Sequence, residues 1–222
     1  MEFGLRRAQG PDAGLYGARA AVIGGCVGTS NVLAGEMFDV PVMGTHAHSW
    51  IMTFKDEYTA FKEYARLYPD ACTLLVDTYD TLKSGVPNAI RVFTEMREAG
   101  IKPKSYGIRL DSGDLAYLSK KARKMLDDAG FQDAVIAASN DLDETLISSL
   151  KLQGAAINSW GVGTNLITSK DCPSFGGVYK LACIIDENGT EIPKIKVSEN
   201  VEKVTNPGNK KILRIYAVSY TH

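Results

Sequence analysis

The sequence lacks the features that would assign it to a membrane, secreted or nucleic-acid-binding class. A membrane-spanning helix needs about eighteen consecutive apolar residues, and no stretch of the sequence approaches that length. The N-terminus is charged and interrupted by glycine, unlike the apolar region of a secretory signal. Lys and Arg total 25 against 26 for Asp and Glu, so no excess of charge favours a polyanion or an anionic lipid surface. We therefore expect a soluble, cytoplasmic protein that binds small metabolites, and neither nucleic acid nor a membrane.

Cysteine and histidine are both scarce. The four cysteines lie far apart without a Cys-x-x-Cys spacing, so neither a disulfide framework nor a zinc site is expected. Two of the three histidines form the pair His46-x-His48, but no further Cys or His lies near enough in sequence to complete a transition-metal site. We expect free thiols and no metal ion held by the protein alone.

What the chain does contain is an alternation of apolar, β-rich runs with longer amphipathic stretches. Such alternation predicts a parallel sheet with crossover helices, in either an open doubly wound sheet or a closed barrel. The expected strands are 42–45, 73–76, 105–110, 134–138 and 155–159, and the expected helices are 31–38, 48–67, 86–99, 115–129 and 143–152. In both architectures the loops after the carboxyl ends of the strands build the ligand site.

A different pattern begins at about Val178. An apolar strand to Ile185, the turn 186–189 and a second strand from Thr190 predict a β hairpin. The Lys-rich sequence that follows is polar and rich in turn residues. We expect this part to be an appended β element.

Polar residues follow the first two expected strands. His48 comes at the start of a helix, where a neutral imidazole can attack a phosphoryl group and the helix N-terminus favours the resulting anion. Asp77 and Asp80 follow the next strand, and Asp77 could hold the tautomer of His48. The alternatives are a capping or packing histidine and aspartates that only cap a helix.

The segment 107–115 offers an arginine and a carboxylate together. Arg109 and Asp111 share one face of a strand by the two-residue period, and Asp114 is placed to cap the next helix. The arginine can grip a carboxylate or phosphate with two hydrogen bonds, and the aspartate can bind a ribose hydroxyl or magnesium. The alternative is a structural ion pair between Arg109 and Asp111.

Two later strand ends carry small and polar residues, in the segments 137–144 and 158–166. The run Gly161-x-Gly163-Thr164 exposes backbone N–H groups that can cradle a phosphate, although an ordinary tight turn has the same sequence pattern. Taken together, the strand ends suit a phosphorylated sugar better than a nucleic-acid duplex or a protein partner.

Six motifs, in order, resemble the nicotinate phosphoribosyltransferase family from the first residues to about Arg214: EFGLRRAQGPD, GTSNVLAG, GTHAHSW, RLDSGDL, SWGVGTNL and KVSE…K…PG. The resemblance implies an irregular parallel (β/α) barrel of the type II phosphoribosyltransferase kind over 1–177, with a C-terminal β element and tail over 178–218. Residues 219–222 no longer follow the family and are expected to be a non-native end. Family members are longer and dimeric, with a mostly N-terminal domain completing the site, so we expect a fragment that is inactive alone.

The resemblance also implies the chemistry: ATP-coupled transfer of a phosphoribosyl group from phosphoribosyl pyrophosphate to nicotinate, with substrate-associated Mg²⁺. His48 would be phosphorylated by ATP, with Asp77 as its orienting partner. Residues implied to contact nicotinate are Phe3, Ser30, Thr45 and Arg109, where a neutral Ser30 suits an anionic substrate. Asp111 would hold the ribose or its magnesium. Phosphate groups would be bound by Arg6, Ser139, Asn140, Gly163 and Thr164.

Two other functions remain open from the sequence. A quinolinate phosphoribosyltransferase would share the barrel and the sugar donor but needs no ATP and no phosphohistidine, and the GTHAHSW motif disfavours it. A barrel that only binds or assembles, without catalysis, is the second alternative.

Overall fold

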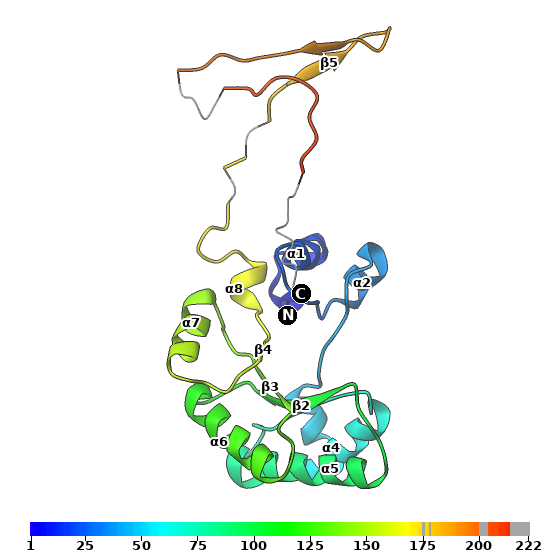
Figure 1. The fold of residues 1–222 in the computed structure, drawn as a ribbon, viewed down its shortest axis with the longest axis vertical. Helices are drawn as coiled ribbons and strands as arrows, with labels where there is room; N and C mark the ends of the chain where they lie inside the picture. Colours follow the sequence, from blue (N-terminus) through cyan, green and yellow to red (C-terminus); the bar gives the residue numbers. More distant parts are fainter. Residues whose placement is uncertain (175, 178, 200–203, 214–222) are drawn as a thin grey trace, which may run out of the picture. The chain divides into compact units, whose positions relative to one another are not determined.

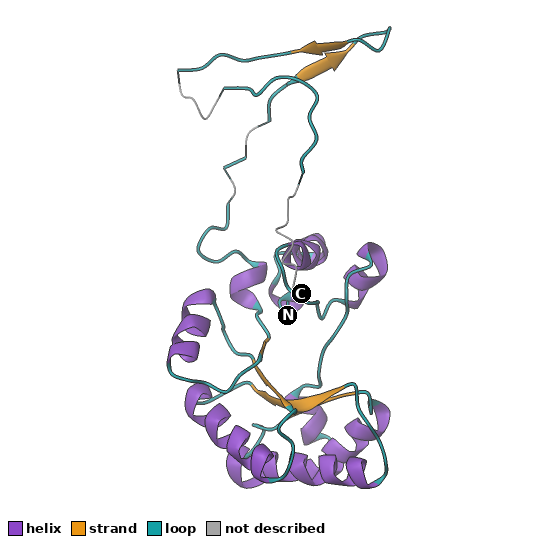
Figure 2. Ribbon diagram, in the orientation of Figure 1, coloured by secondary structure: helices purple, strands orange, loops and turns teal. Residues whose placement is uncertain are grey.

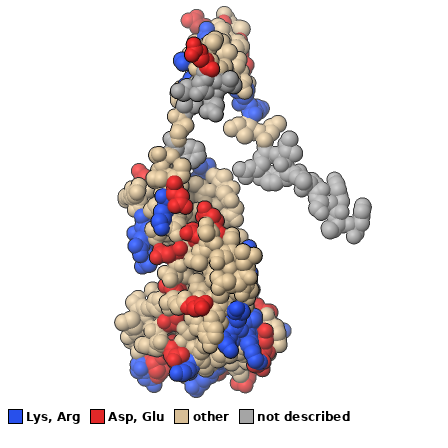
Figure 3. Space-filling view, turned by 90° about the vertical axis from the view of Figure 1, so that its left-hand side faces the viewer, with Lys and Arg blue, Asp and Glu red and all other residues tan. Residues whose placement is uncertain are grey.

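The computed structural model describes residues 1–174, 176–177, 179–199 and 204–213. The chain divides into two compact units, Met1–Pro173 and Ser174–His222. Within the described residues, no helix is both long and apolar enough to cross a membrane. Basic and acidic side chains are mixed over the face in view in Figure 3, as the nearly equal totals of the two signs would suggest.

The first unit is built on a parallel sheet of four strands (Figures 1 and 2). The strands are β1 (Ala71–Leu75), β2 (Ser105–Leu110), β3 (Val135–Ala138) and β4 (Ser159–Trp160), and their order in the sheet follows the sequence. A helix joins each neighbouring pair: α5 (Val86–Glu98), α6 (Leu115–Asp128) and α7 (Glu144–Leu152). The predicted α/β class with a parallel sheet is therefore confirmed, and every strand ends at the same edge.

Several helix boundaries follow local capping signals. Asp114 accepts a hydrogen bond from Tyr117 N–H at the start of α6, and Gly130, with a φ of 82°, follows the end of that helix. The single helix expected over 48–67 is wrong, because Asp56 starts a new helix by accepting from Thr59 N–H at 2.7 Å. The structure therefore has α3 (His48–Met52) and α4 (Glu57–Leu67).

The core lies between the sheet and the helices packed on it. Leu74, Ile108 and Ile136 from three neighbouring strands are fully buried, and Phe61 of α4 is buried with them. Figure 1 shows α4, α5 and α6 along one face of the sheet, and α1 (Pro11–Ile23), α2 (Val32–Phe38) and α8 (Thr164–Ile167) on the other side. The polar strand ends are thus held by an apolar layer beneath them.

Single-residue bridges continue the sheet beyond β4. Glu2 forms parallel bridges with Val162 and Thr29, and Thr29 forms another with Val42. The strand expected over 42–45 is therefore wrong in extent, since only Val42 is bridged. Met43 N–H still donates to the Thr29 carbonyl at 3.0 Å. Farther along this segment, the His46 ring accepts a hydrogen bond from Leu75 N–H of β1.

Four helical segments in the described residues were not expected from the sequence: α1, α8, the short 3-10 helix η1 (Leu5–Arg7) and the segment η2 (Thr81–Gly85) that precedes α5. In α1 a proline stands at the first turn, but Gly14 and Gly17 interrupt the apolar pattern that would have marked it. The segment η2 is a π-helix. It fits tightly, because a Cβ on Gly85 would lie 1.8 Å from the Val76 carbonyl oxygen at the end of β1.

The second unit contains the predicted hairpin. Strands β5 (Cys183–Ile185) and β6 (Glu191–Pro193) pair antiparallel. The Asp186 carboxylate accepts from the N–H groups of Asn188 and Thr190 at 2.9 and 2.8 Å, and Gly189 has a φ of 81°. The appended β hairpin is confirmed, whereas the non-native end expected at 219–222 lies outside the described residues.

Truncating a core side chain should measure how much the buried layer stabilises the sheet. Leu110 is fully buried at the end of β2, so we expect Leu110→Ala to lower the free energy of unfolding by about 2–5 kcal/mol. Leu152 is 91% exposed, and Leu152→Ala should change it by less than about 0.5 kcal/mol. Urea unfolding gives the free energy of unfolding of both variants. Equal decreases in the two variants would contradict the placement of the core.

Candidate active site

A cavity of about 360 Å³ opens at the carboxyl ends of the strands. All the site residues predicted from the sequence line it except Asp77, which lies behind His48. Those that line it are Phe3, Arg6, Ser30, Thr45, His48, Arg109, Asp111, Ser139, Asn140, Gly163 and Thr164. Residues from six separate segments of the sequence thus meet at one place.

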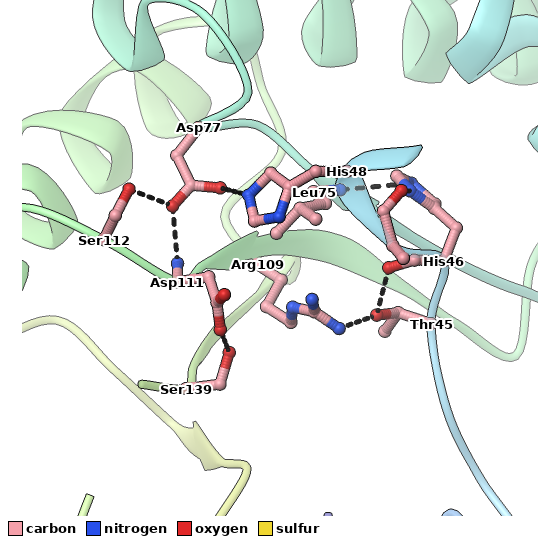
Figure 4. Close-up of polar contacts among 10 residues, drawn as sticks. Thr45, His46, His48, Leu75, Asp77, Arg109, Asp111, Ser112 and Ser139 are labelled. Atoms are coloured by element: carbon pink, nitrogen blue, oxygen red, sulfur yellow. Dashed lines mark hydrogen bonds and ion pairs between the residues drawn. The ribbon is translucent and has the colours of Figure 1, made fainter. Parts of the chain in front are cut away.

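The buried carboxylate of Asp77 is the best-connected group beside this cavity (Figure 4). Its Oδ1 lies 3.1 Å from His48 Nε2, and its Oδ2 accepts from Asp111 N–H at 2.8 Å and from Ser112 Oγ at 2.6 Å. The Asp77 side chain is 2% exposed, while that of His48 is 38% exposed. The aspartate is a fixed internal support, and the histidine is the partner that reaches the cavity.

This contact selects one form of the His48 ring. An ionised carboxylate only accepts hydrogen bonds, so Nε2 must carry the proton when it faces Asp77. In a neutral ring the lone pair then belongs to Nδ1, on the side of the ring away from Asp77 (Figure 4). Of the two aspartates after β1, Asp80 is the one that caps, accepting from Leu82 and Lys83 N–H.

Arg109 and Asp111 point to different partners. The Ser139 hydroxyl donates to Asp111 Oδ1, and the Arg109 guanidinium donates to Thr45 Oγ1. Among the described residues no ion pair joins Arg109 to Asp111, so the alternative of a structural pair is wrong. The companion prediction that Asp114 caps α6 is confirmed by its contact with Tyr117 N–H at 2.9 Å.

Arg109 carries a charge that the protein itself only partly compensates. Burial lowers the pKa of its guanidinium, and the nearby carboxylates of Asp111 and Asp77 oppose that shift. Its Nε atom is buried and has no hydrogen-bond partner. A partly buried cation with a buried, unused donor is costly to leave unpaired, so this position favours an anionic ligand.

His46 is a packing histidine, unlike its neighbour His48. Its Nε2 accepts from Leu75 N–H at 3.2 Å, and its ring meets Tyr64 edge-on with centroids 4.6 Å apart. Burial lowers the pKa of His46 to about 4, with Arg109 adding to the effect. The ring is therefore neutral at physiological pH and serves as a hydrogen-bond acceptor for β1.

Phe3 reaches the cavity through the bridges of the N-terminal segment. Its N–H donates to the Val162 carbonyl at 2.8 Å, which lays its ring against Gly161. A Cβ on Gly161 would lie 2.5 Å from that ring, so a larger residue there would require the Phe3 ring to move. The sequence pattern predicts a phosphate cradle or an ordinary tight turn at this glycine, and the structure shows that it packs against Phe3.

Sequence reasoning missed two charged residues that line the cavity, Arg7 and Asp141. Arg7 follows Arg6 in η1, and the adjacent pair of arginines was the available signal. Counting both, the lining has three arginines and two aspartates. The excess of positive charge suits an anionic ligand.

Comparisons with known proteins agree on one family. The model of the "Nicotinate phosphoribosyltransferase (NAPRTase) family" matches residues 1–213. The chain is 60% identical to the nicotinate phosphoribosyltransferase of Bacillus subtilis (strain 168), covering 100% of this chain and 44% of that protein. It is 33% identical to the Homo sapiens nicotinate phosphoribosyltransferase, covering 97% and 48%. The chain thus spans about half the length of the curated relatives it matches.

Solved structures are similar as well. Human nicotinic acid phosphoribosyltransferase superposes with a TM-score of 0.66 at 32% identity, covering 73% of this chain and 43% of that one. The nicotinate-nucleotide pyrophosphorylase of Pyrococcus furiosus gives 0.59 at 28% identity, covering 76% and 42%.

The buried His46 should make stability depend on pH. The unfolded ring binds a proton below about pH 6.5, whereas the folded ring resists it down to about pH 4, so the free energy of unfolding falls as pH drops through this window. In His46→Gln, the amide oxygen can still accept from Leu75 N–H but does not titrate. We expect that variant to lose on the order of 1–3 kcal/mol less stability between about pH 7 and 4.5. Urea midpoints measure this, and parallel pH profiles for the two proteins would refute it.

Proposed function

Since the chain belongs to the nicotinate phosphoribosyltransferase family, we propose that the protein transfers the phosphoribosyl group of phosphoribosyl pyrophosphate to nicotinate with ATP as energy source. The products are nicotinate mononucleotide and pyrophosphate, in the first step of NAD salvage from nicotinate. The observation that carries the proposal is one cavity shared by His48, Arg109 and Asp111. Each supplies a different function that the reaction needs.

Nicotinate is a flat ring with a carboxylate, and two groups in the cavity match it. The Arg109 guanidinium has an unused buried Nε donor and can bind a carboxylate with two parallel hydrogen bonds. The Phe3 ring offers an apolar face for the pyridine. Ser30 places a neutral side chain on the same cavity, where a further carboxylate would repel the substrate. Thr45, already bonded to Arg109, fixes the direction of the guanidinium.

The sugar donor would lie across the remaining strand ends. Asp111 presents a carboxylate that can accept from ribose hydroxyls, and Ser139 holds that carboxylate through one oxygen. The segments with Ser139, Asn140, Gly163 and Thr164 would bind a phosphate, and Arg6 the pyrophosphate. Mg²⁺ commonly takes one or two carboxylates together with substrate phosphates, and Asp111 fits that pattern. Such an ion would neutralise charge on the leaving pyrophosphate.

Transfer requires stabilisation of separated charge. The bond between the anomeric carbon and pyrophosphate breaks while the pyridine nitrogen forms a bond to that carbon, and positive charge develops on the sugar. Asp111 stabilises that charge, and the arginines stabilise the leaving anion. No protein nucleophile needs to attack the sugar.

His48 would couple ATP to this transfer. The Nδ1 lone pair attacks the γ-phosphorus, a phosphorus–nitrogen bond forms, and ADP leaves with the electrons of the broken bond. The Asp77 carboxylate, bonded to Nε2–H, stabilises the positive charge that grows on the ring. A phosphate on His48 would then favour the state that binds phosphoribosyl pyrophosphate tightly, and its hydrolysis would release products.

The same family membership supports proposals about the protein's wider architecture. The bridges running from Val162 to Val42, and the hydrogen bond between Leu75 and His46, support a sheet that closes into an irregular α/β barrel. We also propose a homodimer and a cytoplasmic setting, where ATP and the sugar donor are available. A quinolinate enzyme is less well supported, because its chemistry gives no role to an aspartate-bound His48.

Phosphorylation of His48 can be tested directly with γ-labelled ATP. We expect acid-labile label on the protein, its loss by at least about 100-fold in His48→Gln, and its retention in His46→Gln, since His46 offers its Nε2 to a backbone N–H instead. Scintillation counting before and after acid treatment measures it. Label that is retained in His48→Gln, or that is lost only in His46→Gln, would contradict the coupling mechanism.

Recognition of nicotinate can be tested with Arg109→Lys. The lysine keeps a positive charge but loses the planar pair of donors, so the dissociation constant for nicotinate should rise on the order of 10–100-fold. Affinity for phosphoribosyl pyrophosphate should change little. Calorimetry measures the dissociation constants of both ligands. Binding of both by the wild type would also argue against a barrel that only assembles and has no formed site. Unchanged nicotinate affinity would refute the assignment.

A further inference from the structure

The loop that follows β3 has an unusual backbone. Asn140 has a φ of 95° and Asp141 a φ of 44°, so two consecutive residues other than glycine lie in the left-handed region. Both residues line the cavity, directly after Ser139, which is bonded to Asp111. Conformations of this kind persist only where surrounding contacts hold them.

The contact that holds this loop comes from Asn165, the second residue of α8. Its Nδ2 donates to the carbonyl oxygen of Asp141 at 3.0 Å and to that of Leu142 at 3.1 Å. Leu142 is buried, so the far side of the loop is anchored in the core. Asn165 itself is not among the residues that line the cavity.

The position of Asn165 joins the two segments proposed to bind phosphate. It immediately follows Gly163 and Thr164, and it bonds to the loop that carries Ser139 and Asn140. Below this point the neighbouring strands are joined by a backbone hydrogen bond from Gly161 N–H to Ala138. Beyond that bond, the Asn165 amide makes the hydrogen bonds that link the two segments in the described part of the chain.

We propose that Asn165 is a positioning residue that fixes the spacing of the two phosphate-binding segments and so controls affinity for the sugar donor. The inference rests on the proposed function, because it takes the 5-phosphate of phosphoribosyl pyrophosphate as the group bound between them. An asparagine suits this role because its amide nitrogen carries two hydrogens, one for each carbonyl. An aspartate of the same shape would set a carboxylate oxygen against two carbonyl oxygens and push the loop away.

The test compares Asn165→Asp with a matched control, Gln132→Glu. Gln132 also donates from its side-chain amide to a backbone carbonyl, that of Asp127 at 3.1 Å, and it does not line the cavity. Both substitutions replace an amide with a carboxylate and add one negative charge. Asn165→Ala removes the donors without adding charge and serves if the aspartate variant folds poorly.

Calorimetric titration with phosphoribosyl pyrophosphate and Mg²⁺, and separately with nicotinate, gives the readout. We expect Asn165→Asp to weaken binding of the sugar donor on the order of 10–100-fold, Asn165→Ala to weaken it less, and Gln132→Glu to leave it within about twofold. Nicotinate affinity should stay within about twofold in all three variants. Its proposed partner Arg109 lies on β2, whereas Asn165 holds the loop that follows β3.

The outcomes distinguish this inference from the function it rests on. If the Asn165 variants lost affinity equally for both ligands, the site would be damaged in general and the positioning role would be wrong. Unchanged affinity for the sugar donor would also overturn that role. A wild-type protein that binds nicotinate but not phosphoribosyl pyrophosphate would instead contradict the proposed function itself.

Discussion

The site depends on the hydrogen bonds of one buried carboxylate. Asp77, at the end of β1, binds the ring of His48 from the start of α3 and the backbone N–H of Asp111 from the end of β2. Removing it would leave a partly buried backbone donor unpaired and would free the histidine ring to rotate. The same group therefore sets the tautomer of the proposed nucleophile and fixes the backbone of Asp111, the residue proposed to bind the ribose.

Burial gives the neighbouring residues opposite roles. His46 and His48 are two residues apart, yet one is packed against Tyr64 with its pKa lowered to about 4 and the other opens toward the cavity. Arg109 is partly buried, and its Nε atom is buried without a hydrogen-bond partner. Burial thus keeps the structural His46 ring neutral. It also leaves the Arg109 cation partly without water, at a position where an anionic substrate can bind it.

The features predictable from sequence were those set by local patterns. The alternation of strands and helices, the cap at Asp114 and the hairpin turn at Asp186 each depend on a few neighbouring residues, and the structure confirms them. The period of two along β2 placed Arg109 and Asp111 at the same strand end. The break inside 48–67 was missed because Asp56 is only one capping residue within a continuous apolar pattern.

Long-range contacts escaped that reasoning. Phe3 reaches the cavity because its segment bridges to Val162, and nothing in the local sequence records that pairing. The strained loop at Asn140 and its bonds to Asn165 depend on the same kind of distant contact. The roles of the site residues came from the family resemblance together with the chemistry of each side chain, and the fold explains how they meet.

Asp77 occupies one ring nitrogen of His48 and so leaves the other as the proposed nucleophile. Phosphorus-31 NMR of the protein phosphorylated by ATP tests this division most directly, because phosphate on Nδ1 and phosphate on Nε2 give different chemical shifts. We expect the Nδ1 product. A phosphate on Nε2, the nitrogen bonded to Asp77, would contradict the proposed mechanism.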